Sequence, residues 1–284
     1  MKRINRPGKS VKDILRIIAK EASRKRDADK IKDTETILTQ REEIYIQKCS
    51  ITSLFEIPML TDITAEVKRP EMESFYSYRL RDYKNIEGRK IYDEIIMSAP
   101  RGKCPYCSKR DANTVDHFLP QALYPSYAIT PVNLVPSCSV CNTEKNYSFP
   151  TNQNDQTLHP YFDNIEDDDW LQAELIISEP IHFNFFVNNP GNWTELLFER
   201  VCYHFNSYNL NNLFSSEAID ELNSMHLQLK NQFNNGAANL KDFLAETFES
   251  KLAVERNSWR TAMYKAMLNN DWFLNGCLGN SFFQ

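Results

Sequence analysis

The segment from Cys104 to Asn146 determines how one part of this chain folds. It reads CPYC at residues 104–107, VDHFLP at 115–120, TPVNLVPSC at 130–138 and CNTEKN at 141–146. Two Cys-x-x-Cys pairs frame a polar stretch that contains an Asp-His dipeptide and an asparagine shortly after a proline. Because candidate metal ligands and polar residues gather here, we expect the functional site in this segment.

The four cysteines predict a zinc site. Two thiolate pairs, each separated by two residues, can place four sulfur ligands tetrahedrally around one Zn²⁺. We therefore assign Cys104, Cys107, Cys138 and Cys141 to one structural zinc ion. The alternative is four buried, reduced cysteines without a metal. A site closed by four cysteines has no open coordination position, so any chemistry is expected to lie elsewhere.

The residues between the cysteine pairs predict a small folded unit. This stretch, 108–137, is longer than the ~15–20 residues usual in a zinc ribbon, so the zinc is expected to hold the base of an inserted unit. We expect strands at 114–119 and 134–136 and a helix at 139–147. The predicted order is strand, long loop, strand, helix.

This segment resembles the HNH endonuclease motif of the four-cysteine type, which has a ββα-metal fold. By that resemblance His117 is the first histidine of the motif, Asn133 is its central asparagine, and Asn142 stands where the final histidine or asparagine falls. Lys145 matches a lysine that is common three residues later. The resemblance implies hydrolysis of phosphodiester bonds, most often in DNA, with Mg²⁺ or another divalent cation.

The chemistry of the residues agrees with that resemblance. A neutral imidazole can take a proton from an attacking water, so His117 is the expected general base. Asp116 and Asn142 can offer oxygen ligands to a hard cation that stabilises charge on the phosphate. Adjacent residues on a strand point to opposite faces, so Asp116 and His117 can share a metal site only if the strand ends or twists there.

Three further residues have supporting roles in this hypothesis. Asn133 can bond backbone groups across the loop and keep the His117 strand in register. Lys145 follows Asn142 by one helical turn and can face the same phosphate as a point charge. His159, in the sequence LHPYFD, is either a further metal ligand or phosphate contact, or a structural histidine.

Composition bounds the rest of the chain. With 284 residues, 42% hydrophobic and 25% charged, it is typical of a globular protein of one or two domains. No apolar run is long enough to cross a bilayer, and the first residues lack the apolar stretch of a signal peptide. We therefore expect a cytoplasmic protein without membrane association, and the three remaining cysteines show no pairing pattern that would argue otherwise.

Charge is unevenly distributed. The net charge of −5 is unfavourable for a chain that must hold a polyanion by itself. Basic residues at the start of the chain, including Arg24-Lys25-Arg26, could neutralise phosphates or could form a solvated helix face. Residues 151–199 contain no Lys or Arg and many acidic residues, so this segment either docks a basic partner protein or is a solvated edge.

The expected architecture is α+β, with a small zinc-stapled ββα unit embedded in a mostly helical protein. The predicted regions are a helical part at 1–98 that is basic at its start, the HNH unit at 99–165, and an accessory part at 166–284. Helices are predicted after a Ser10–Asp13 capping box, over 35–48 and around residues 219–233, 240–248 and 259–267. A short helix or turn is predicted over 92–97, before Pro100 and Gly102. A hairpin is predicted from strands at 173–178 and 181–187.

The chain has no Gly-rich phosphate loop and no nucleophile elbow, so ATP hydrolysis by this chain is not expected. A narrower resemblance, carried by the HNH unit, the following His-Pro-Tyr-Phe-Asp and the helical tail, is to HNH nucleases of bacterial anti-phage systems, including the Septu type, which pairs with an ATPase. It implies antiviral defence with a protein partner and leaves an RNA or tRNA target open. The rival functions are a non-catalytic, zinc-containing nucleic-acid-binding module and a protein scaffold.

Overall fold

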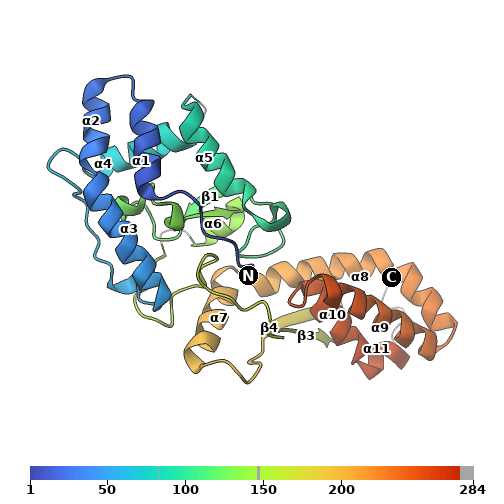
Figure 1. Cartoon of the computed structure of the whole chain (residues 1–284). Helices are drawn as coiled ribbons and strands as arrows, with labels where there is room; N and C mark the ends of the chain where they lie inside the picture. Colours follow the sequence, from blue (N-terminus) through green and yellow to red (C-terminus); the bar gives the residue numbers. More distant parts are fainter. Residues whose placement is uncertain (83, 146–147, 276–284) are drawn as a thin grey trace. The chain divides into compact units, whose positions relative to one another are not determined.

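The computed structural model describes residues 1–82, 84–145 and 148–275 (Figure 1). The chain divides into two compact units, Met1–Ile165 and Glu166–Gln284. Both are mostly helical, and each contains one two-stranded sheet. The predicted α+β class is therefore confirmed, with a small ββα unit inside a helical protein. In the described part of the chain, no helix combines the length and the apolar character that crossing a membrane requires.

The first unit begins with three helices, α1 (Val11–Lys20), α2 (Lys25–Asp33) and α3 (Glu35–Ser50). The predicted capping box is confirmed: the Asp13 amide donates to Ser10 Oγ at 3.3 Å, and the Ser10 amide donates to the Asp13 carboxylate at 3.0 Å. The helix predicted over 35–48 is also confirmed. Sequence spacing did not predict α2, because Ile31 is its single buried residue and no apolar stripe marks it.

A π-helix follows and adjoins the helix before the first cysteine pair. Residues Arg69–Ser74 form α4, Phe75–Arg81 form the π-helix η2, and Ile86–Met97 form α5. The sequence predicted a short helix or turn at 92–97, and the structure has a helix that begins six residues earlier. π-helices are rare and occur frequently at functional sites. The surroundings of η2 are therefore of particular interest.

Two contacts fix the start of α5. The Glu21 carboxylate accepts hydrogen bonds from the backbone amides of Glu87 and Gly88, at 2.8 and 3.0 Å. A Cβ atom at Gly88 would lie 1.8 Å from the carbonyl oxygen of Arg79 in η2. Only glycine allows the two backbones to approach so closely. Gly88 thereby sets the position of α5 against η2.

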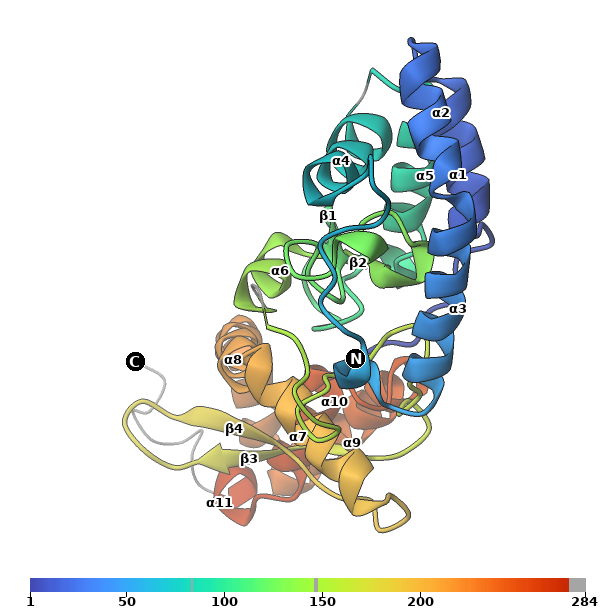
Figure 2. The same cartoon turned by 90° about the vertical axis from the view of Figure 1, so that its left-hand side faces the viewer.

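The ββα unit consists of β1 (Thr114–His117), β2 (Leu134–Ser137) and α6 (Ser139–Lys145). The strands are antiparallel, with His117 opposite Leu134. In the first unit, α1, α2 and α3 lie on one side and α6 on the other, with the two strands between them (Figure 2). The strand predicted to end at residue 119 stops at His117, and the last two residues of the predicted helix, 146 and 147, lie outside the described residues.

One continuous hydrophobic core joins the N-terminal helices to the ββα unit. Helix α1 contributes Val11, Ile14, Leu15 and Ile18, and the hairpin and its loop contribute Val115, Ala128, Ile129 and Leu134. Short 3₁₀ turns complete the unit at Leu54–Glu56, Pro100–Gly102, Pro125–Tyr127 and Pro131–Asn133. The helices and the cysteine-framed segment of the first unit therefore form one packed body.

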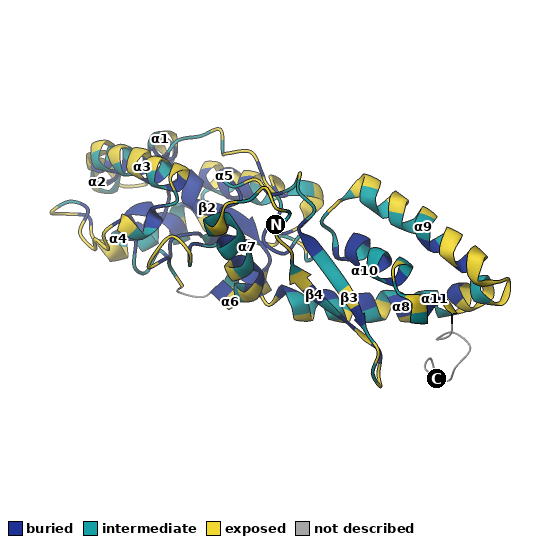
Figure 3. Cartoon of the chain, turned by 90° about the horizontal axis from the view of Figure 1, so that it is seen from below, coloured by how far each residue is buried: buried dark blue, intermediate teal, exposed yellow. Residues whose placement is uncertain are grey.

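The second unit combines a hairpin with helices. Strands β3 (Leu171–Ile176) and β4 (His182–Val187) pair antiparallel, which confirms the predicted hairpin. The helices are α7 (Glu195–Ser207), α8 (Leu210–Asn234), α9 (Ala237–Val254), α10 (Trp259–Leu268) and α11 (Asp271–Asn275). Figure 3 shows α10 largely buried and a long exposed face on α9. Spacing predicted α8, α9 and α10 but missed α7, whose buried face includes the polar residues Arg200 and His204.

Candidate metal centre and active site

The four cysteines meet at the base of the ββα unit. Cys104 and Cys107 lie in the turn before β1, Cys138 follows β2, and Cys141 lies in the first turn of α6. All four side chains are buried, and their sulfur atoms lie within 4.8 Å of one another. A tetrahedron with Zn–S bonds of ~2.3 Å has S–S edges of ~3.8 Å, so this donor set fits zinc. The cluster suggests a zinc ion enclosed by four thiolates, as predicted.

His117 stands at the last position of β1. Its Nε2 lies 2.9 Å from the carbonyl oxygen of Ala128, which can only accept, so Nε2 carries the proton and Nδ1 keeps its lone pair. Burial lowers the pKa of His117 to about 4, and the positive charges of Lys145 and Arg81 act in the same direction. The edge of the Tyr76 ring packs against the imidazole, with ring centroids 4.4 Å apart. The imidazole is therefore held in one orientation and is neutral at pH 7.

Asp116 points to the opposite face of β1, into the interior. Its carboxylate accepts a hydrogen bond from the Tyr106 hydroxyl at 2.8 Å and forms an ion pair with Lys145 Nζ at 3.0 Å. Lys145 Nζ also donates to the backbone oxygen of His117 at 2.5 Å. The side chains of Lys145 and Asp116 are only 5% and 4% exposed. The structure thus pairs these two predicted site residues, and a cation would reach the Asp116 carboxylate only by displacing the Lys145 ammonium group.

Asn142 lies in the first turn of α6, beside the zinc ligand Cys141. Its backbone amide donates to the Cys138 carbonyl at 3.1 Å, and its side chain is half-buried. Within the described residues, no hydrogen bond joins its side chain to Asp116 or His117. The backbone of Asn142 is therefore fixed beside the four-cysteine cluster, while its side-chain amide is bound to neither of these two residues.

Asn133 holds the loop against the end of β1. Its Oδ1 accepts hydrogen bonds from the Leu119 amide at 2.7 Å and from the Tyr45 hydroxyl at 3.0 Å. Its Nδ2 donates to the backbone oxygens of Leu119 and Tyr127, both at 3.1 Å. The residue is fully buried. These four bonds fix the loop around Asn133 against the residues that follow β1.

His159 belongs to the same buried network. Its Nδ1 accepts from the Tyr161 amide at 3.3 Å, and its Nε2 lies 3.1 Å from the Tyr45 hydroxyl. Because Tyr45 donates its proton to Asn133, Nε2 of His159 must be the donor to Tyr45. Its ring also stacks on Phe118 at 4.0 Å. Both nitrogens are engaged inside the protein, an arrangement that favours the structural alternative over metal binding.

Three tyrosines complete the site and were not predicted. Tyr45 in α3 holds Asn133, Tyr106 holds Asp116, and Tyr76 in η2 packs against His117. Tyr45 and Tyr76 come from helices outside the cysteine-framed segment, so no motif spacing could have identified them. Tyr106 lies within CPYC, where its position between two zinc ligands was the one available signal.

Several of the charged residues noted in the sequence have partners within their own unit. Near the N-terminus, Lys12 and Arg16 both pair with Glu35, at 3.2 and 3.4 Å. In the acidic segment, Asp169 pairs with Lys265 at 2.8 Å, and Asp168 accepts from the indole of Trp193 at 2.6 Å. Part of the apparent charge asymmetry is therefore balanced within each unit.

A β-hairpin followed by a helix, with a four-cysteine site at its base and a neutral histidine at the end of its first strand, defines a zinc-type HNH unit. Residues 104–148 match the HNH endonuclease family, which confirms the resemblance seen in the sequence.

Two relatives extend this assignment. The chain is 31% identical to protein ea31 of Escherichia phage lambda over 232 residues, which cover 76% of this chain and 77% of that protein. It is 32% identical to the Septu protein PtuB of Bacillus thuringiensis over 71 residues, which cover 23% of this chain and 28% of that protein. No solved structure matches. The chain therefore belongs to the same family as protein ea31, and its residues 104–148 form an HNH endonuclease domain.

Proposed function

We propose that this chain is an endonuclease that hydrolyses phosphodiester bonds in nucleic acid, with DNA as the first candidate substrate. The observation that carries the proposal is the state of His117. Its Nε2–H group donates a hydrogen bond to the Ala128 carbonyl, and the low pKa of the imidazole keeps Nδ1 unprotonated near pH 7. Nδ1 can therefore accept a proton from the water that attacks the phosphorus.

The family is metal-dependent, and the site offers oxygen donors for a hard cation. A divalent cation would stabilise the negative charge on the phosphate and the leaving oxygen. We assign Asp116 and Asn142 as its protein ligands, since carboxylate and amide oxygens suit Mg²⁺. For Asp116 this assignment requires the carboxylate to leave Lys145 and Tyr106 and to turn toward the His117 side of β1. Lys145 is the internal counter-ion of Asp116. Asn133 and Tyr76 hold the histidine in place but do not react.

One observation favours a second candidate function. The Asp116 carboxylate is buried against Lys145 and Tyr106, as expected if it only stabilises the fold. On that alternative the chain is a zinc-containing nucleic-acid-binding or scaffold protein without catalysis. The two candidates differ in whether added divalent cation produces cleavage.

A biological role in anti-phage defence, with a protein partner such as an ATPase, is a further part of the proposal. Its support is the similarity to the Septu protein PtuB. Protein ea31 of phage lambda shows that a chain similar to this one also occurs in a phage. Co-purification from the native host tests the partner, and recovery of the chain alone would contradict it.

The nuclease proposal is tested with purified, zinc-loaded protein. Plasmid DNA, single-stranded DNA and total tRNA are each incubated with Mg²⁺, with Mn²⁺ or without added divalent cation. Cleavage of DNA that requires the divalent cation is the expected result. Cleavage of tRNA alone would support an RNA-cleaving enzyme, and cleavage of none of the three would support the non-catalytic candidate.

A further inference from the structure

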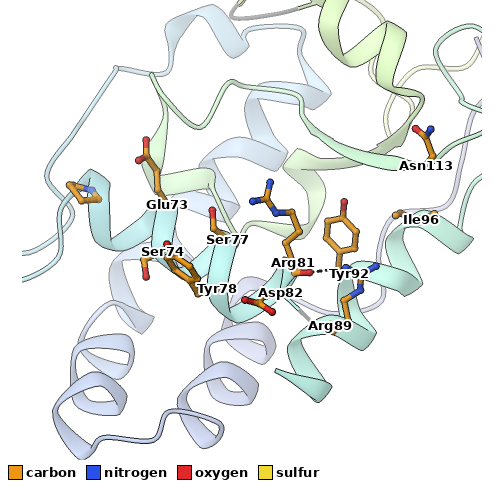
Figure 4. Close-up of a pocket in the computed structure, with 11 residues that line it drawn as sticks. Glu73, Ser74, Ser77, Tyr78, Arg81, Asp82, Arg89, Tyr92, Ile96 and Asn113 are labelled. Carbon is orange, nitrogen blue, oxygen red and sulfur yellow. Dashed lines mark hydrogen bonds between the residues drawn. The ribbon is translucent and has the colours of Figure 1, made fainter. Parts of the chain in front are cut away.

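A cavity adjoins the proposed active site on the side of the π-helix. It has a volume of about 720 Å³ and lies between η2 and α5, with Asn113, the residue before β1, at its edge. That volume is within the ~300–1,000 Å³ usual for ligand sites. Its lining residues include Ser77, Arg81 and Tyr92 (Figure 4).

Tyr76 contacts both Arg81, which lines the cavity, and the proposed base His117. Arg81 Cζ lies 5.9 Å from the centre of the Tyr76 ring, and the His117 ring centre lies 4.4 Å from the same point. Tyr92 also neighbours that ring, with centroids 6.4 Å apart. The guanidinium carbon of Arg81 therefore lies within about 10 Å of the ring centre of His117, the residue proposed to activate water.

Arg81 differs from its neighbours in having no carboxylate partner in the part of the chain that the structure describes. Arg79, two residues earlier, pairs with Asp27 at 3.6 Å, and Arg89 pairs with Asp93 at 2.8 Å. The side chain of Asp82 is directed away from the guanidinium of Arg81 and accepts from the Lys84 amide at 3.0 Å (Figure 4). The guanidinium of Arg81 is thus exposed in the cavity with its charge uncompensated.

Other donors face the same side as Arg81. In Figure 4 the Ser77 hydroxyl, the Arg81 guanidinium and the Tyr92 hydroxyl point in one direction. Ser77 and Arg81 are four residues apart on η2, and Tyr92 comes from α5. The acidic residue on this side, Glu73, is held by Arg69 at 2.7 Å, so its charge is balanced. A planar guanidinium with nearby hydroxyl donors suits an anion that accepts several hydrogen bonds, as a phosphate does.

We propose that Arg81, with Ser77 and Tyr92, binds a backbone phosphate of the DNA substrate and so places a neighbouring phosphodiester at His117. The proposal rests on the proposed nuclease function, because it assigns the substrate contact of the same site. Arg81 is a binding residue in this scheme, and Gly88 keeps the cavity in shape by allowing α5 to approach η2.

The test separates binding from cleavage. Binding of a short fluorescein-labelled DNA duplex is measured by anisotropy with His117→Ala protein, so that cleavage does not interfere. Arg81→Gln is added to this background, and Lys90→Gln is the matched control. Lys90 lies on α5 outside the cavity, is 61% exposed and pairs with Glu87. Both variants remove one positive charge from an exposed position, so both are expected to fold.

Arg81→Gln is expected to weaken binding about tenfold or more, which is the scale of one lost hydrogen-bonded charge contact. The slope of log K against log salt concentration should shrink by about 0.9, since one fewer phosphate is neutralised. Arg81→Lys should restore the salt slope but only part of the affinity. Lys90→Gln should remain within about twofold of its parent, as expected for a charge that contacts no phosphate.

Equal affinity and equal salt slope for Arg81→Gln and Lys90→Gln would overturn the proposal, as would absence of DNA binding by the His117→Ala parent. The outcome is distinct from that of the nuclease test. DNA cleavage by the wild type with no effect of Arg81→Gln would retain the nuclease and reject the phosphate contact. Arg81-dependent binding without cleavage by any variant would retain the contact and reject the nuclease.

Discussion

Replacing Lys145 by Met tests the buried ion pair beside His117. The substitution keeps a long side chain but removes the ammonium group that contacts Asp116 at 3.0 Å. The carboxylate would then be buried with the Tyr106 hydroxyl as its remaining partner described above. Breaking a buried pair by removing one partner costs about 3–5 kcal/mol. For a unit of this size, each kcal/mol lowers the melting temperature by about 2–4 °C, so a loss of roughly 10 °C is expected.

Lys103→Met is the matched control for this experiment. Lys103 makes an ion pair of similar length with Asp111, at 2.6 Å, but the two side chains are 46% and 80% exposed. An exposed pair of this kind contributes under about 1 kcal/mol. Thermal and urea unfolding, followed by circular dichroism, measure both variants. Adding Asp116→Asn to Lys145→Met should recover part of the loss, since no unpaired charge then remains buried. Equal stability of Lys145→Met and Lys103→Met would refute the reasoning.

Three further predictions concern pH, packing and zinc. The pKa of His117 is lowered to about 4 from an unfolded value near 6.5. Between these two pH values the imidazole is protonated in the unfolded chain but neutral in the folded protein. The melting temperature of the wild type should therefore fall as the pH decreases from 6.5 towards 4. The melting temperature of His117→Gln, measured without divalent cation, should fall less steeply over the same pH range. The same pH dependence for both proteins would contradict this. Gly88→Ala would place a Cβ 1.8 Å from the Arg79 carbonyl and should cost about 1–3 kcal/mol in urea unfolding, whereas Gly8→Ala, with nothing within 4 Å, should be close to neutral. Cys138→Ser or a strong chelator should unfold the first unit and remove one zinc per chain by elemental analysis, because metal binding and folding are coupled; a folded, metal-free unit would argue against a structural zinc.

The cysteine-framed segment was predictable because its ligands are local in sequence. Two Cys-x-x-Cys pairs predict a metal site by spacing alone, and the strand around Asp116-His117 was predicted with its end two residues too late. The long amphipathic helices were also predictable, since apolar residues at helical spacing must face a core. Helix α7 was missed because Arg200 and His204 interrupt its buried face.

The partners of the site residues were not predictable in the same way. Tyr45 and Asn133 are 88 positions apart, and their hydrogen bond depends on how α3 packs against the loop before β2. The sequence suggested that Lys145 could face a phosphate, but α6 directs its ammonium group inward to Asp116. Arg81 was not considered, because it lies outside the motif and only the packing of η2 against the ββα unit brings it near His117.

Chemical rescue of the proposed base tests the central claim most directly. Zinc-loaded wild-type and His117→Ala proteins are incubated with plasmid DNA and Mg²⁺, with and without added imidazole. The account predicts cleavage by the wild type, no cleavage by His117→Ala, and partial recovery when imidazole supplies the missing proton acceptor. Equal cleavage by both proteins without imidazole would show that His117 is not the base, and the catalytic assignment would then fail.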